Sequence, residues 1–304
     1  MYGWGDDYAD WRNPKAYRFS GSPTARKSRR KAARASEQRG GRKYLNRSQP
    51  DLERVSPRDK RLHTDSPDPL VVAVDVTGSM ASWPYEIFDR LPLLYQTLSQ
   101  YRPELEIVFV AIGDATSDSY PLQVCDFARG IELEDELNAL YGEGGGGGGA
   151  RESYELFADF LLHNARAPEA RERPFLILYG DEGFYERVSA AQVRYHIGGQ
   201  RKGDRDSLKV WRALGEAWNI YHFRKPYPGG DETICAQWAE ALGEERVLPL
   251  DGAERAVDMA LGLIARAWGH YADFEQNMAA RQPTAAVREL GRRLDRLGCT
   301  GGAA

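Results

Sequence analysis

The sequence is poor in cysteine and histidine, and it lacks a long apolar run. Cys125, Cys235 and Cys299 stand far apart without a Cys-x-x-Cys pair, so their spacing encodes neither a zinc cage nor a disulfide framework. The five histidines show no His-Glu-x-x-His motif. No apolar run approaches the roughly 20 residues that span a bilayer, and the first residues lack the pattern of a signal peptide. We therefore expect a cytoplasmic protein without a membrane segment.

Charge is distributed unevenly along the chain. Residues 1–67 hold 17 Lys and Arg against 8 Asp and Glu, whereas the remainder holds 24 against 37. The first segment also has few aliphatic residues, so it cannot offset the entropy cost of folding, and we predict a disordered basic N-terminal arm. Such an arm is either a solvated tail or a segment that neutralises nucleic-acid phosphates or an acidic protein surface.

From residue 68 to residue 271, apolar segments of strand length alternate with helical segments. The runs LVVAVDV, LEIVFVAI and PFLILYG are continuously apolar, as in parallel strands that are buried on both faces. Leucine and isoleucine recur at spacings of three and four over Trp83–Tyr101, which predicts a helix there. We also expect helices at 150–165 and, as one long helix, at 253–271. This rhythm predicts an α/β fold with a doubly wound, mostly parallel central sheet and helices on both faces. Residues 272–304 are expected to form a C-terminal helix and tail.

Side chains that could bind a ligand cluster where the first predicted strand ends, in LVVAVDVTGSM. Asp75, Thr77 and Ser79 alternate with Val76 and Gly78, and residues two apart in an extended segment can point the same way. One carboxylate and two hydroxyls aimed at a common point suit a hard divalent cation such as Mg²⁺, which takes oxygen ligands. The alternative is that these side chains only cap a turn or the following helix.

These residues resemble the metal-ion-dependent adhesion site (MIDAS) of von Willebrand factor A-type (vWA) domains, in which Asp-x-Ser-x-Ser follows the first strand, a Thr comes from a second loop and an Asp from a third. Thr77 stands in place of the first Ser. The third element resembles Asp181 in LYGDEGF, with Glu182 as a competitor. No Thr stands in the second loop, GEGGGGGG, so that Glu152, Ser153, backbone groups or water would supply the missing oxygen.

The resemblance covers roughly residues 69–270 and implies a vWA or Rossmann-like fold with a non-enzymatic role. The bound ion, Mg²⁺ or Mn²⁺, would keep an open coordination position for an Asp or Glu carboxylate of a partner protein. Bacterial intracellular vWA proteins often work with AAA+ ATPases of the MoxR type or inside conflict-related systems, so the resemblance implies a partner of this kind. The alternative function is phosphoryl transfer of the haloacid-dehalogenase type, with Asp75 as nucleophile, although the second carboxylate of that chemistry would fall at Thr77.

Two further features lie near the same predicted edge of the sheet. Asp114 follows another central strand. It would either influence the metal site, for example by a hydrogen bond to a water that binds the ion, or only stabilise a turn, as Asp residues in loops commonly do. The glycine run 142–149 is not followed by the Lys-Ser/Thr of a phosphate-binding loop, so we interpret it as a mobile or connecting loop.

Overall fold

The computed structural model describes residues 49–146, 149–200, 202–280, 282 and 284–298. At its centre is a six-stranded sheet in the order β12-β11-β7-β2-β3-β4. The strands are β2 (Pro69–Asp75), β3 (Glu106–Ile112), β4 (Leu122–Val124), β7 (Phe175–Gly180), β11 (Asn219–Arg224) and β12 (Val247–Pro249). Neighbouring strands are parallel except for β4, which is antiparallel to β3. The predicted α/β class with a mostly parallel central sheet is confirmed.

The order in which the chain visits the strands reverses between β2 and β7. From β2 the chain continues outward to β3 and β4, then returns to β7 on the other side of β2 and proceeds to β11 and β12. Val74 of β2 pairs with both Ala111 of β3 and Tyr179 of β7, so these three strands end at a similar level. Ligands of open parallel sheets bind beyond the carboxyl ends of the strands where such a reversal occurs.

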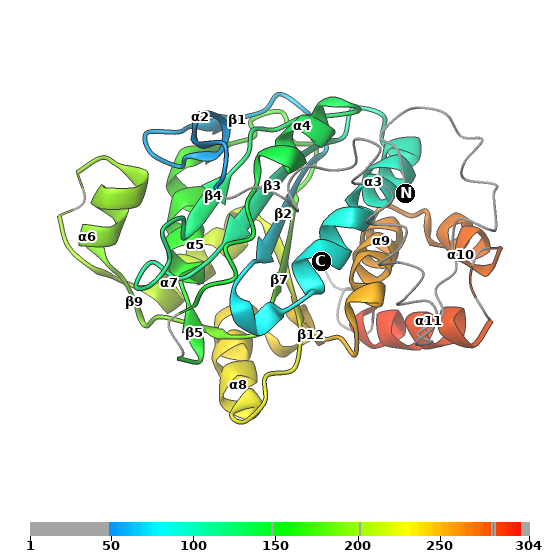
Figure 1. Ribbon diagram of the computed structural model, residues 1–304. Helices are drawn as coiled ribbons and strands as arrows, with labels where there is room; N and C mark the ends of the chain where they lie inside the picture. Colours follow the sequence, from blue (N-terminus) through cyan, green and yellow to red (C-terminus); the bar gives the residue numbers. More distant parts are fainter. Residues whose placement is uncertain (1–48, 147–148, 201, 281, 283, 299–304) are drawn as a thin grey trace.

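Helices cover both faces of the sheet (Figure 1). On one face α3 (Trp83–Tyr101) packs with α9 (Ala256–Ala267), and on the other α5 (Tyr154–Asn164) packs with α7 (Ser207–Ala217). This double cover explains why every residue of β2 is buried and why its sequence is continuously apolar. The helix α3 has the predicted bounds, and Pro84 lies in its first turn, where the missing N–H is tolerated.

Shorter elements surround this framework. Further helices of the described residues are α2 (Leu52–Val55), α4 (Glu132–Ala139), α6 (Ala190–Gln192), α8 (Asp231–Leu242), α10 (Tyr271–Ala279) and α11 (Thr284–Gly298). Pairs of two-residue strands are β1 (Leu62–His63) with β6 (Ala165–Arg166), β5 (Arg151–Glu152) with β8 (Gly183–Phe184), and β9 (Arg187–Val188) with β10 (Arg205–Asp206). Single helical turns are η3 (Gly78–Met80), the π turn η4 (Val193–Ile197), η5 (Glu244–Arg246) and η6 (Ala253–Arg255).

The predicted boundary of the basic arm at residue 67 needs correction. Residues 49–67 fold against the body: β1 pairs with β6, and Val55 and Leu62 are buried in the same core as the central strands. Polar and charged neighbours surround these two apolar residues in the sequence, so composition alone placed them in the arm. Residues 1–48, which include the most basic part of the predicted arm, lie outside the described residues.

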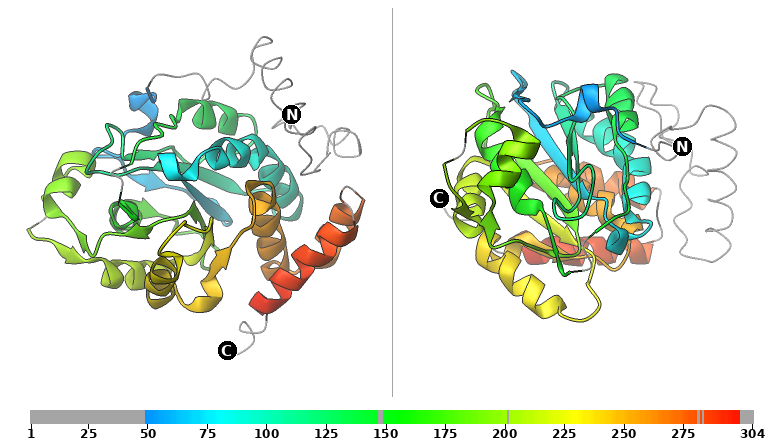
Figure 2. Two further views of the ribbon diagram at one scale, coloured as in Figure 1. Left: turned by 60° about the horizontal axis from the view of Figure 1, so that its bottom comes forward. Right: turned by 60° about the vertical axis from the view of Figure 1, so that its left-hand side comes forward.

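The C-terminal part also packs on the body. The single helix predicted over 253–271 is instead α9 followed by α10, because Gly269 adopts a φ of 80° and breaks the helix between them. Beyond it, α11 lies against α9 and α10 (Figure 2), and the side chains of Phe274 and Leu294 belong to the common core. The predicted boundary at residue 271 therefore does not separate two folding units.

None of the helices among the described residues is both long and apolar enough to cross a bilayer.

Candidate functional site

Four of the predicted site residues meet at the carboxyl edge of the sheet, where the strand order reverses. Asp75 is the last residue of β2, Thr77 follows it, and Ser79 lies in the turn η3. Asp181 directly follows β7, the strand that pairs with β2. Because parallel neighbours end at the same edge, two loops that are about a hundred residues apart in sequence lie side by side.

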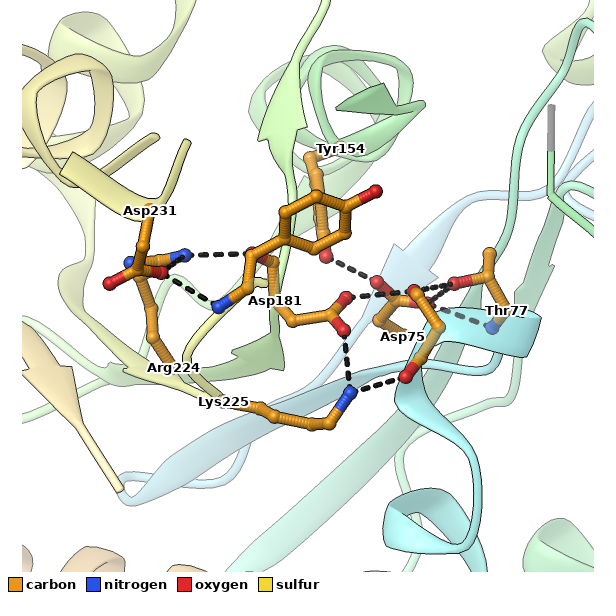
Figure 3. Close-up of polar contacts among 9 residues, drawn as sticks. Asp75, Thr77, Tyr154, Asp181, Arg224, Lys225 and Asp231 are labelled. Carbon is orange, nitrogen blue, oxygen red and sulfur yellow. Dashed lines mark hydrogen bonds and ion pairs between the residues drawn. The ribbon is translucent and has the colours of Figure 1, made fainter. Parts of the chain in front are cut away.

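Hydrogen bonds and one close contact between hydroxyl oxygens link these four side chains (Figure 3). Asp75 is fully buried, and its Oδ1 accepts hydrogen bonds from the Thr77 backbone N–H at 2.8 Å and from the Thr77 hydroxyl at 2.6 Å. The Thr77 and Ser79 hydroxyl oxygens lie 3.1 Å apart. The Ser79 hydroxyl donates in turn to Oδ1 of Asp181 at 2.9 Å. The oxygens therefore converge on one region, and Asp75 in addition caps the turn after β2 through the Thr77 N–H.

Tyr154, at the start of α5, contacts the other oxygen of Asp75. Its hydroxyl donates a hydrogen bond to Asp75 Oδ2. The approach depends on Gly180 at the end of β7, because a Cβ there would overlap the Tyr154 hydroxyl. Both oxygens of Asp75 are thus held in fixed positions. No sequence motif pointed to Tyr154, whose contribution arises only when α5 packs on the sheet.

A lysine side chain also reaches into the cluster. Lys225 directly follows β11, and its ammonium donates to Oδ2 of Asp181 at 2.9 Å and to the backbone carbonyl of Ser79. The adjacent Arg224 is buried, and its guanidinium donates to the Asp181 carbonyl at 2.7 Å and to Asp231 Oδ1 at 2.9 Å. Sequence analysis did not assign either basic residue to the site. Together they hold the Asp181 loop in place.

Glu152 is buried beside this cluster, in β5 and not in the helix predicted from residue 150. The helix begins only at Tyr154, because Arg151 and Glu152 pair with β8. The Glu152 side chain is 2% exposed, and its Oε2 has no hydrogen-bond partner. Glu182, the sequence neighbour of Asp181, is 3% exposed and has the same unpartnered Oε2. Two buried carboxylate oxygens therefore lack a donor.

Carboxyl groups that resist ionisation accumulate at this edge. Burial and the nearby charge of Asp181 raise the pKa of Asp75 to about 7. Burial and repulsion by Asp75 raise the pKa of Glu152 to about 10. Burial and repulsion by Asp181 raise the pKa of Glu182 to about 7. Each shift has the same origin, because a desolvated carboxylate next to others of its kind is costly to ionise.

Ser153 and Asp114 form hydrogen bonds in the loop that follows β3. The Ser153 hydroxyl oxygen accepts from the Ala115 N–H at 2.8 Å and lies 3.4 Å from Oδ1 of Asp114. Asp114 accepts from the backbone N–H of Thr116 at 3.0 Å and from the Tyr185 hydroxyl at 3.1 Å. Of the two side chains considered for the missing second-loop Thr, Glu152 lies close enough to Asp75 to be repelled by its charge, whereas Ser153 is engaged with Asp114.

The described part of the glycine loop lies against the turn that carries Thr77 and Ser79. The Gly78 N–H donates to the Gly145 carbonyl at 2.6 Å, and the Gly144 N–H donates to the Val76 carbonyl at 3.1 Å. A Cβ at Gly78 would lie 2.9 Å from the Gly144 oxygen, which is closer than a carbon and an oxygen approach each other. Glycine at position 78 therefore permits the two loops to touch.

Within the described ranges, no group of three or more His, Cys, Asp or Glu side chains is arranged to hold a metal ion. Asp75, Asp181 and Glu152 are therefore not arranged as a three-carboxylate metal group. The four linked side chains supply two carboxylates and two hydroxyls.

Comparison of the sequence with protein-family models and with curated proteins finds no match. Among solved structures, the pilus adhesin SpaC of Lactobacillus rhamnosus GG in its open conformation is similar, with a TM-score of 0.51 and 11% sequence identity over 72% of this chain. Proximal thread matrix protein 1 from the mussel byssus has a TM-score of 0.45 and 9% identity over 68% of this chain and 48% of its own. The chain spans 31% of the length of the adhesin, and the likeness to it is one of fold alone.

Proposed function

We propose that this chain carries a doubly wound α/β domain of the vWA type, which binds a divalent cation, Mg²⁺ or Mn²⁺, and uses it to engage a partner protein. The observation that carries the proposal is the convergence of carboxylate and hydroxyl oxygens from two loops at the reversal point of the sheet. The ligands in this proposal are Asp75, Thr77, Ser79, Asp181 and Glu152.

The chemistry of the donors fits a hard cation. Such ions prefer carboxylate, hydroxyl and water oxygens, and the linked side chains offer only these. The unpartnered oxygens of Glu152 and Glu182 support the same interpretation, since a buried carboxylate oxygen without a donor is costly and a cation nearby would offset that cost. A bound ion would supply positive charge and an open coordination position at the edge of the sheet.

The remaining residues of the site have positioning roles. Tyr154 and the Thr77 N–H fix the orientation of the Asp75 carboxylate, and Arg224 fixes the backbone beside Asp181. Because these contacts are already made, the Asp75 carboxylate and the Asp181 backbone need little rearrangement when a ligand arrives. A site that is preorganised in this way binds its ligand more favourably than a site built from mobile side chains.

The partner in this proposal offers an Asp or Glu carboxylate. Its bond to a partly desolvated cation is charge-assisted and depends on orientation, so it would give specificity without catalysis. From the resemblance of DVTGS to vWA domains, we place a MoxR-type AAA+ ATPase or a component of a bacterial conflict system first among candidate partners, in the cytoplasm.

Isothermal titration of Mg²⁺ and Mn²⁺ into the wild type and Asp75→Ala tests the metal site. We expect saturable heat in the wild type and none in the variant. The matched control is Asp68→Asn, because Asp68 precedes β2 at the opposite end of the strand and is also buried, between Arg102 and Arg171. Absence of metal-dependent heat in the wild type, or heat unaffected by Asp75→Ala, contradicts the proposal. Hydrolysis of a phosphate ester that disappears in Asp75→Ala would favour phosphoryl transfer instead.

A further inference from the structure

The ammonium group of Lys225 contacts residues that the proposed function assigns to the metal ion. It donates to a carboxylate oxygen of Asp181 and to the carbonyl of Ser79, and both residues belong to the proposed ligand set. The lysine backbone is anchored, because its N–H donates to the Gly180 carbonyl at 2.9 Å. Its side chain is 21% exposed, so the flexible stem has a route toward solvent.

A divalent ion held by Ser79 and Asp181 would be a close neighbour of this ammonium. The ion and the ammonium are both positively charged, so they repel each other strongly where water is largely excluded. Asp181, which both would contact, is fully buried. The ammonium also engages one of the two Asp181 oxygens, while the Ser79 hydroxyl engages the other. The ion and the lysine therefore compete for the same carboxylate.

We propose that Lys225 is a built-in cation that occupies Asp181 when no metal is bound, and that a divalent ion binds by displacing its ammonium toward solvent. The inference rests on the proposed metal-binding function. Its consequence is a site with weakened affinity for the ion, in which metal binding also releases an amine at the edge of the sheet.

Lys60 offers a matched comparison elsewhere in the molecule. Its ammonium likewise joins a carboxylate, Asp126 Oδ2 at 3.0 Å, to backbone carbonyls, those of Val124 at 2.9 Å and of Arg54. The Lys60 side chain is 12% exposed, and its partners lie outside the candidate site. Removing this ammonium reproduces the loss of an ion pair without changing the charge beside Asp181.

Titration of Mn²⁺ into the wild type, Lys225→Met, Lys60→Met and Asp75→Ala tests the proposal. We expect Lys225→Met to bind Mn²⁺ more tightly than the wild type by roughly tenfold or more, because a neighbouring positive charge is removed. Lys60→Met should match the wild type. Equal or weaker binding by Lys225→Met, with binding still lost in Asp75→Ala, overturns the role of Lys225 and leaves the metal site intact. Absence of binding in every variant overturns both proposals.

Amine labelling of the wild-type protein provides a second readout that does not depend on how the variants fold. Acetic anhydride modification of Lys225, quantified by mass spectrometry, should increase at saturating Mn²⁺, whereas modification of Lys60 should not change. Unchanged or reduced labelling of Lys225 in the presence of Mn²⁺ would show that the ammonium stays on Asp181, and the displacement model would then be wrong.

Discussion

At the scale of single residues, Glu155 in α5 is a buried carboxyl group that lies close to the site but outside the proposed ligand set. Its Oε2 accepts a hydrogen bond from the Tyr185 backbone N–H at 3.1 Å, whereas its Oε1 has no partner. The side chain is fully buried, and burial raises its pKa to about 8. The folded protein therefore binds a proton here that the unfolded chain releases at much lower pH.

This difference predicts that Glu155 makes the fold less stable as the pH rises. At pH values below 4.5, the pKa of Glu155 in the unfolded chain, Glu155 is protonated in both the folded and the unfolded state. Its contribution to the free energy of unfolding is then fully present. As the pH increases toward 8, the unfolded state ionises first and the contribution is lost. Glu155→Gln should remove this penalty, so that the variant gains roughly 2–4 kcal/mol relative to the wild type between pH 5 and pH 8.

Urea denaturation of both proteins at the two pH values measures this gain. A difference between Glu155→Gln and the wild type that stays constant from pH 5 to pH 8 would mean that Glu155 ionises with an ordinary pKa despite its burial.

Sequence reasoning found the acidic residues that follow β2 and β7 and also Glu152, but not Tyr154 or the basic residues at the end of β11. Asp75 and Asp181 were recognisable because each follows an apolar run, and parallel strands bring such positions together. Their role as metal ligands stays a prediction. Tyr154 was not recognisable because its contact depends on how α5 packs against the sheet. Lys225 was not recognisable because its contact with Asp181 depends on β11 lying next to β7. Local sequence carries no information about that packing.

At the scale of elements, contact between the glycine loop and the turn η3 has a steric requirement. Gly78→Ala would place a Cβ 2.9 Å from the Gly144 oxygen and 3.2 Å from the Gly145 oxygen, both in backbone. Since backbone cannot yield as a flexible side chain does, we expect a loss of about 1–3 kcal/mol in the free energy of unfolding, together with weaker Mn²⁺ binding. Urea denaturation and Mn²⁺ titration measure the two effects.

The same loop supplies the control for this prediction. A Cβ at Gly149 meets no atom within 4 Å, so Gly149→Ala should leave stability and Mn²⁺ affinity close to those of the wild type. Equal behaviour of Gly78→Ala and Gly149→Ala would show that close contact between the two loops is not required.

Long elements were predictable and short ones were not. The apolar runs of β2, β3 and β7 and the periodicity of α3 extend over enough residues to distinguish strand from helix. Two-residue strands such as β5 and β1 have no periodicity at all. Their pairing with β8 and β6 is decided by tertiary contacts, which is why the start of α5 and the limit of the folded body were misplaced.

At the scale of the whole molecule, residues 49–67 are an integral part of the fold. Val55 and Leu62 are fully buried or nearly so, and Arg54 donates to Glu136 at 2.7 Å. A chain that begins at residue 68 should therefore melt about 10 °C below one that begins at residue 49, because it loses two buried aliphatic side chains and a strand pairing.

Differential scanning calorimetry of the two truncated chains and the full-length protein checks this expectation. A chain beginning at residue 68 with an unchanged melting temperature would show that α2 and β1 add nothing to stability.

The α/β class followed from the alternation of strand and helix segments, whereas the order of strands did not. Alternation predicts a parallel sheet, because each helix returns the chain to the same end. The antiparallel β4 breaks this rule, since a loop and not a helix joins it to β3.

The outermost strands of the sheet limit how molecules of this chain can associate. Both β4 and β12 have only three residues, and β12 ends in Pro249, which has no N–H to offer. Long, regular edges recruit strands from other chains and lead to fibres, and edges this short present few free backbone groups for that purpose. Among the described residues, the rim of the central sheet thus offers little backbone to which a strand of another chain could be added.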